Sequence, residues 1–91
     1  MEQRFGLTEG QRQAAWKDFY HYSNEAAMEA IDLAGGDLDK ETEMSEQIFS
    51  KYRARIIKYY SVTEDELGRI VAEGMVKGWK MPLPSYKPIA K

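Results

Sequence analysis

Three titratable side chains are spaced so that a helix would place them on one face, namely Asp18, His21 and Glu25. Residues three and four positions apart are neighbours on a helix surface. A histidine between two carboxylates can bind a metal or shuttle a proton, as in carboxylate-bridged sites of helical bundles. This face lies opposite the apolar positions of the same segment, so we interpret all three side chains as solvated. We therefore assign no catalytic residue, no metal and no cofactor, and a metal-dependent helical-bundle enzyme ranks third among the candidate functions.

A second group of chemically active residues is basic. Lys51, Arg55 and Lys58 follow one another at i, i+4 and i+7, and such a stripe can contact phosphates or an acidic partner. A nucleic-acid-associated regulator that uses this stripe is the alternative function. The formal net charge of −2 provides no basic excess. In addition, no short turn followed by a basic recognition helix comes after the segment VTEDEL, residues 62–67. Nucleic acid is therefore not the partner we expect.

Acidic residues gather in one segment of the chain. Residues 24–46 contain eight acidic side chains and a single basic one, Lys40, whereas 47–60 and 77–91 each contain four basic side chains and no acidic one. The acids of GGDLDKETE follow helical spacing rather than the loop spacing of a calcium site. We interpret them as a solvated helix start that can receive a basic surface.

Length and composition indicate the class of protein that carries these residues. Ninety-one residues with 43% hydrophobic and 31% charged residues are typical of one globular domain. Cysteine is absent, which excludes disulfides and thiolate chemistry. Neither a membrane span nor the apolar run of a signal peptide is present, so we expect a cytoplasmic protein without a membrane partner. A core this small leaves a thin stability margin, which favours a homo-oligomer.

The first predicted helix covers about residues 9–34. Thr8 and Gln11 form a capping-box pattern, and Gly35 with Gly36 ends the helix. Apolar residues form two adjacent rows, so this helix should contact two neighbours. The first row is Ala15, Phe19, Tyr22, Ala26, Ala30 and Leu33, and the second is Trp16, Tyr20, Ala27, Ile31 and Ala34.

A second helix is predicted over about residues 38–60, capped by Asp37 or Asp39. Its acidic side chains lie in its first half and its basic side chains, apart from Lys40, in its second half, the order that complements the helix dipole. The positions that we expect in the core are Leu38, Ser45, Ile48, Phe49, Tyr52, Ile56, Tyr59 and Tyr60.

The third helix is short, about residues 64–77. In VTEDEL, Thr63 and Glu66 form a second capping box, and Gly78 is placed to end the helix. Gly74 shares the inner face, and because glycine in a helix costs about 0.5–1 kcal/mol we expect the backbone of another helix to approach closely there. Glu73 is expected to point away from the core.

These elements predict an all-α, antiparallel three-helix bundle over residues 1–80, followed by an extended, proline-containing C-terminal arm over residues 81–91. The third helix is too short to cover the whole helical hairpin, so the turn between the two long helices should stay uncovered and acidic. We expect the basic, apolar arm to fold over this tip, in its own chain or in a second copy. The candidate interaction residues are Ile31, Leu38, Met44, Gly74, Trp79, Met81, Leu83 and Tyr86.

The sequence thus favours a small non-enzymatic interaction or regulatory module that acts through helix-mediated association. Its expected partner is a second copy of the chain, forming a homodimer, or another protein.

Overall fold

The structure, a computed structural model, describes residues 4–91, so residues 1–3 of the predicted bundle lie outside the described residues. The described chain is all-α and forms three helices, α1 (Glu9–Ala34), α2 (Leu38–Tyr60) and α3 (Glu64–Lys77). Their bounds agree with the predicted ones. Strands are absent between residues 4 and 91, where one isolated bridge joins Arg4 to Leu7.

The helix ends form as the capping residues require. Thr8 and Thr63 each accept a hydrogen bond from the third helical amide, and Gln11 and Glu66 complete the two capping boxes. Asp37, rather than Asp39, caps α2. Gly35 and Gly78 end α1 and α3 in the left-handed conformation, which glycine adopts without strain. Local sequence signals therefore set every helix boundary except the end of α2, where Ser61 takes the same conformation.

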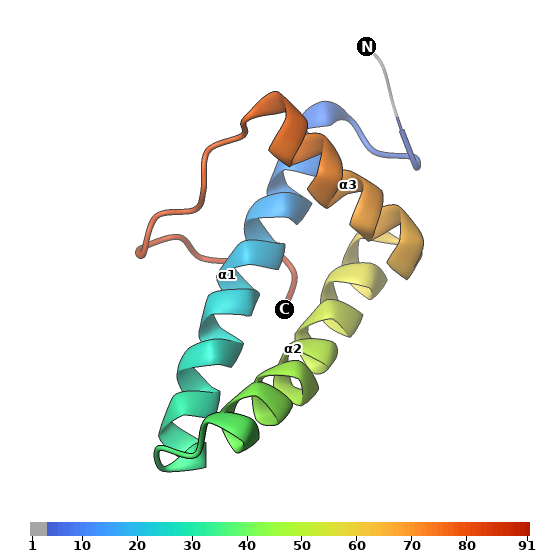
Figure 1. Ribbon diagram of the computed structural model, residues 1–91. Helices are drawn as coiled ribbons and strands as arrows, with labels where there is room; N and C mark the ends of the chain where they lie inside the picture. Colours follow the sequence, from blue (N-terminus) through green and yellow to red (C-terminus); the bar gives the residue numbers. More distant parts are fainter. Residues whose placement is uncertain (1–3) are drawn as a thin grey trace.

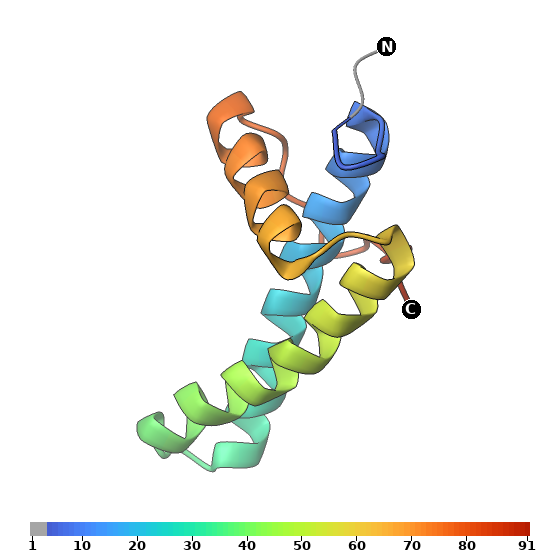
Figure 2. The same ribbon diagram turned by 90° about the vertical axis from the view of Figure 1, so that its right-hand side faces the viewer.

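The two long helices lie side by side and are joined at the Gly35–Gly36 turn (Figure 1). The α3 helix packs mainly against the first half of α1, at the opposite end from that turn (Figures 1 and 2). The C-terminal arm, residues 81–91, then passes beside the middle of α1 and brings the chain end toward α2 (Figure 1). One end of the molecule is consequently thicker than the other.

The hydrophobic core occupies the thick end. Ile56, Leu67 and Ile70 are fully buried there, one from α2 and two from α3. Trp16 and Tyr22 contribute the large rings from α1, and Ala90 closes the core from the arm. Within the described residues, none of the three helices combines the length and the apolar character that crossing a membrane requires.

Two core positions predicted on α2 are wrong. Leu38 is 75% exposed and Tyr59 is 54% exposed, and only Ile56 and Tyr60 of this helix are buried. The reason is geometric, because α3 and the arm cover only the last turns of α2 and the first turn of α2 has α1 as its sole neighbour (Figure 2). We define residues 24–46 as the open end and the remaining described residues as the covered end.

Candidate functional site

The most highly connected polar side chain is Asp18 on α1. It is completely buried, and its carboxylate accepts hydrogen bonds from the hydroxyls of Tyr60 and Tyr86 and from the backbone amides of Ile89 and Ala90, the last at 2.9 Å. Three of these four donors belong to the C-terminal arm. The prediction that Asp18 is solvated is therefore wrong, because the arm returns onto this face of α1.

The arm makes a further hydrogen bond close to Asp18, through the backbone of Ala90. The Tyr22 hydroxyl donates to the carbonyl of Ala90, so the penultimate residue is held through both its amide and its carbonyl. Burial, together with the hydrogen bond to Asp18, raises the pKa of Tyr60 and that of Tyr86 above the ordinary value of 10.0. Both hydroxyls therefore stay protonated and act as donors.

This anchor places the arm away from the position that we predicted. The amides of Ile89 and Ala90 bind Asp18 in the first half of α1, and the turn at Gly35 and Gly36 remains exposed. The arm thus folds onto its own chain, but not over the acidic tip. Asp18 accepts three hydrogen bonds from the arm in a buried site, whereas most acidic side chains near the turn remain exposed.

A buried ion pair joins α1 to α3. Arg12 is 2% exposed, and its guanidinium contacts both carboxylate oxygens of Glu73, with Nε at 2.8 Å from Oε1. Lys77 donates to the same carboxylate at 2.7 Å and also contacts Glu9. The hydrogen bond from Arg12 holds the pKa of Glu73 below its usual value of 4.5. The prediction that Glu73 points away from the core is wrong, since Arg12 reaches it from the neighbouring helix.

Gly74 and Trp79 both pack on Trp16. A Cβ atom at Gly74 would lie 2.8 Å from Cε2 of the Trp16 indole and closer still to Nε1, so Gly74 does have a close neighbour, although not the helix backbone that we predicted. The neighbour is a side chain of α1 and not a helix backbone. Trp79 packs edge-on against the same indole at a centroid distance of 6.1 Å, at the covered end. These two candidate interaction residues thus lie at the joint between α3 and α1.

His21 does not share a metal site with its predicted partners. Its Nε2 lies 4.0 Å from a carboxylate oxygen of Glu25. The carboxylate of Asp18 instead accepts hydrogen bonds from the arm. The imidazole ring packs beside the rings of Tyr22 and Tyr86. In residues 4–91, no group of three histidine, cysteine or acidic side chains is arranged to hold a metal ion.

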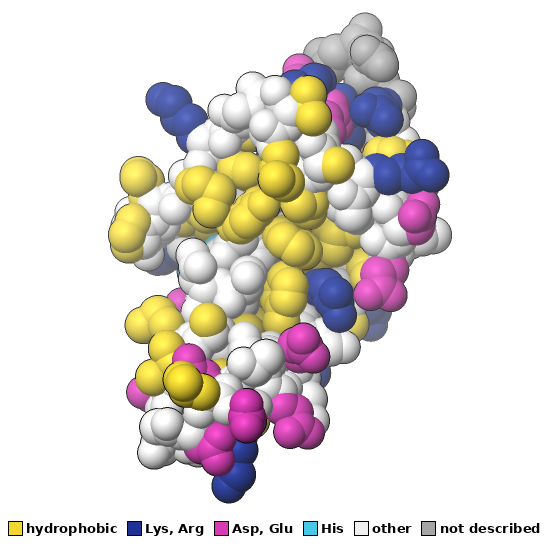
Figure 3. Space-filling view, in the orientation of Figure 1, with side chains coloured by type: hydrophobic (Ala, Val, Ile, Leu, Met, Phe, Trp, Pro, Cys, Tyr) yellow, Lys and Arg dark blue, Asp and Glu magenta, His cyan; other side chains and the backbone are white. Residues whose placement is uncertain are grey.

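Large apolar side chains remain exposed on α1 and on the arm. Ile31 is 53% exposed, Leu83 is 71% exposed, and Met28 and Met81 are similarly open. Figure 3 shows apolar groups on the α1 flank at the open end, bordered by acidic side chains, and again on the projecting arm. Of the other candidate interaction residues, Leu38 is exposed at the turn, and Met44 and Tyr86 are half-buried.

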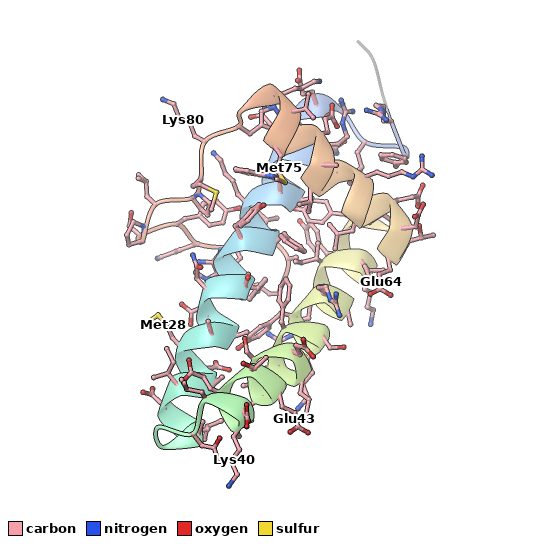
Figure 4. All side chains as sticks on the ribbon, viewed as in Figure 1. Met28, Lys40, Glu43, Glu64, Met75 and Lys80 are labelled. Carbon is pink, nitrogen blue, oxygen red and sulfur yellow. The ribbon has the colours of Figure 1, made fainter. Side chains whose placement is uncertain are left out.

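A groove connects the two apolar groups. It has a volume of about 560 Å³ and is lined by Ala27 and Met28 of α1, by the arm residues 82–84, and by His21, Asn24 and Glu25. A second depression on the other side of the arm is lined by Lys17 and Lys80 together with Met81 and Leu83. Figure 4 shows Lys80 and Met28 on the same side of α1, with the arm between them. We call this surface, Lys17 and residues 24–32 of α1 with residues 80–84, the arm flank.

The predicted basic stripe lies on the outer surface of α2. Lys51, Arg55 and Lys58 are all exposed, and Arg55 packs over the ring of Tyr52. Arg55 and Lys58 line a shallow surface with Tyr59 and Lys91. Their placement is that of solvated side chains.

Two structural roles were missed from the sequence. Arg12 lies one helical turn before Trp16 and therefore on the apolar face, which is the signal that could have identified it as buried. For Asp18 no comparable signal exists, because its donors are 42 to 72 residues away in the chain.

No known protein family model, curated protein or solved structure matches this chain.

Proposed function

We propose that the protein is a small, non-enzymatic interaction module that acts by helix-mediated association through the arm flank. In this proposal the long helices of an antiparallel bundle present one face, and the extended proline-containing arm widens it. The observation that carries the proposal is the presence of two exposed apolar groups, Met28 with Ile31 on α1 and Met81 with Leu83 on the arm, with a groove lined by Met28 and Leu83 between them.

Exposure of single apolar residues is ordinary, but a contiguous apolar surface bordered by charge is typical of protein interfaces. The groove of about 560 Å³ adds a concave site to this surface. Methionine is well suited to such a role, since its flexible side chain adapts to a partner. Support is also energetic, because a chain of 91 residues has a small core and gains stability from a partner that binds only the folded form.

The test is site-specific photo-crosslinking in cells that express the chain. A photoreactive residue at position 28 or 83 should trap a discrete protein adduct. The matched control is position 64, whose side chain points from the opposite side of the molecule in Figure 4 and is exposed to solvent.

Adducts at positions 28 and 83 but not at position 64 support the proposal. The mass of the adduct gives the class of partner, since a doubled mass indicates a second copy and any other mass a different protein. Equal labelling of all three positions, or no adduct at the arm flank, would contradict an interaction role for this surface.

A further inference from the structure

The partner can be specified from shape and charge, an inference that rests on the proposed function. We propose that the arm flank binds the arm flank of a second copy, related by a two-fold axis, with the two α1 helices antiparallel.

The shape of the flank is self-complementary. Leu83 projects from the arm with 71% of its surface exposed, and the groove beside it is lined by Ala27 and Met28. In a two-fold arrangement, each Leu83 enters the groove of the other copy, and each Met28 is covered in return. An exposed apolar side chain that borders a groove can insert into the same groove of a second copy across a two-fold axis, as an isologous interface requires.

The charges select the antiparallel orientation. One half of the flank carries Glu25 in the groove and Asp32 one to two turns further on, within a segment of eight acidic residues. The other half carries Lys17 and Lys80. Antiparallel pairing places the acidic half of each copy against the basic half of the other, while parallel pairing would place like charges together.

The shape of the whole chain agrees with this geometry. Its extents are 48 × 24 × 23 Å, and the acidic open end lies at one extreme of the long axis (Figures 1 and 3). Two elongated copies with opposite charge at their ends attract each other most when they lie side by side and reversed. A dimer of this kind also relieves the repulsion among the acids of the open end.

Sedimentation equilibrium of the full chain tests the interface. The wild type should show a monomer–dimer equilibrium, and Leu83→Asp should raise the dimer Kd by about 30-fold or more, because it buries a charge at two symmetric sites. The control is Val76→Asp on α3, which is 88% exposed and lies outside the flank, so its Kd should match that of the wild type. A strictly monomeric wild type, or equal effects of the two variants, overturns the proposal.

A charge swap tests the orientation. Glu25→Lys and Lys80→Glu should each weaken self-association by about tenfold, since each creates two like-charge contacts. In an equimolar mixture the two variants form a heterodimer in which both contacts again join opposite charges, so the Kd should return to within about threefold of the wild type. Failure of the mixture to recover overturns the antiparallel arrangement.

These results separate this inference from the proposed function. Cross-links from positions 28 and 83 to a different protein, with a monomeric purified chain, retain the interaction role and overturn self-association. A dimer that is insensitive to Leu83→Asp overturns the arm flank as its interface.

Discussion

The covered end and the open end of this molecule differ in how far their apolar and charged side chains are buried. At the covered end, α3 and the arm enclose α1, and the buried charged side chains of Asp18 and Arg12 each have several hydrogen-bond partners. At the open end, only α1 and α2 pack together, and Ile31 and Leu38 face outward. The α3 helix and the arm form a third layer over one half of the helical hairpin. The other half keeps an exposed apolar surface, which the proposed partner would cover.

The two ends also differ in what their charges do. A buried carboxylate with four donors fixes one position of the arm, because removal of any partner leaves polar groups unsatisfied. The acidic side chains of the open end are mostly exposed and together produce a negative field, which in the proposed association would orient a partner without fixing local structure. Stability should therefore depend on the covered end, and association on the open end and the arm flank.

The largest expected effect is that of Asp18→Ala. The substitution leaves four hydrogen-bond donors without an acceptor in a buried site and should lower the free energy of unfolding by about 3–5 kcal/mol. Urea unfolding followed by circular dichroism measures this loss. Asp32→Ala, an exposed position on the same helix, is the control and should change stability by less than about 0.5 kcal/mol.

The same variant reveals whether Asp18 acts through the arm. In a chain truncated after Lys80, three of its four donors are already absent, so adding Asp18→Ala should cost much less than in the full chain. Additive losses from the truncation and the substitution would show that the arm and Asp18 stabilise the fold independently.

Gly74→Ala should produce a smaller loss than Asp18→Ala, about 2 kcal/mol. The added methyl group overlaps the buried Trp16 indole, and we expect the cost of displacing this ring to outweigh the gain in helix propensity. Thermal or urea unfolding measures the difference. Gly68→Ala is the matched control on the same helix, where a Cβ atom meets nothing within 4 Å. It should instead stabilise the protein by about 0.5–1 kcal/mol, and a loss at Gly68 would show that alanine is unfavourable in α3 for a reason unrelated to Trp16.

The contrast between the two ends also separates what sequence reasoning can reach from what it cannot. Capping residues such as Thr63 and periodic apolar rows act over a few residues, so the helix bounds and the exposed tip were predictable from local pattern and length. The burial of Asp18 and Glu73 depends on partners from distant segments. Helical periodicity, which places acidic side chains on the solvent-exposed face, therefore predicts both of them wrongly. The predicted target of the arm was wrong for the same reason, since net charge favoured the tip and specific hydrogen bonding favours Asp18. The predicted roles of the basic stripe and of the interaction residues stay predictions.

Alkaline pH should destabilise the covered end. The pKa of Tyr60 is raised in the folded chain, so the unfolded chain loses its proton first, and stability falls as the pH rises above about 10. The expected slope is about 1.4 kcal/mol per pH unit for this tyrosine. Urea unfolding at a series of alkaline pH values measures it, with Tyr60→Phe reducing the slope and Tyr59→Phe, at an exposed position, leaving it unchanged. Equal slopes in the two variants would contradict a buried, protonated Tyr60.

The smallest effect belongs to the open end and is the most direct test of the comparison. Ile31→Ala and Ile56→Ala remove the same atoms, but Ile31 is 53% exposed and Ile56 is fully buried. Ile56→Ala should cost about 2–5 kcal/mol through lost burial and the cavity that it leaves, whereas Ile31→Ala should change the stability of the monomer by less than about 0.5 kcal/mol. The measurement must be made at chain concentrations well below the dimer Kd, because dimerisation that covers Ile31 would add a concentration-dependent term. With increasing concentration the cost of Ile31→Ala should grow while that of Ile56→Ala stays constant. A large cost at low concentration would mean that the open end is closed within a single chain, and the division of the molecule into a stabilising end and an associating end would then fail.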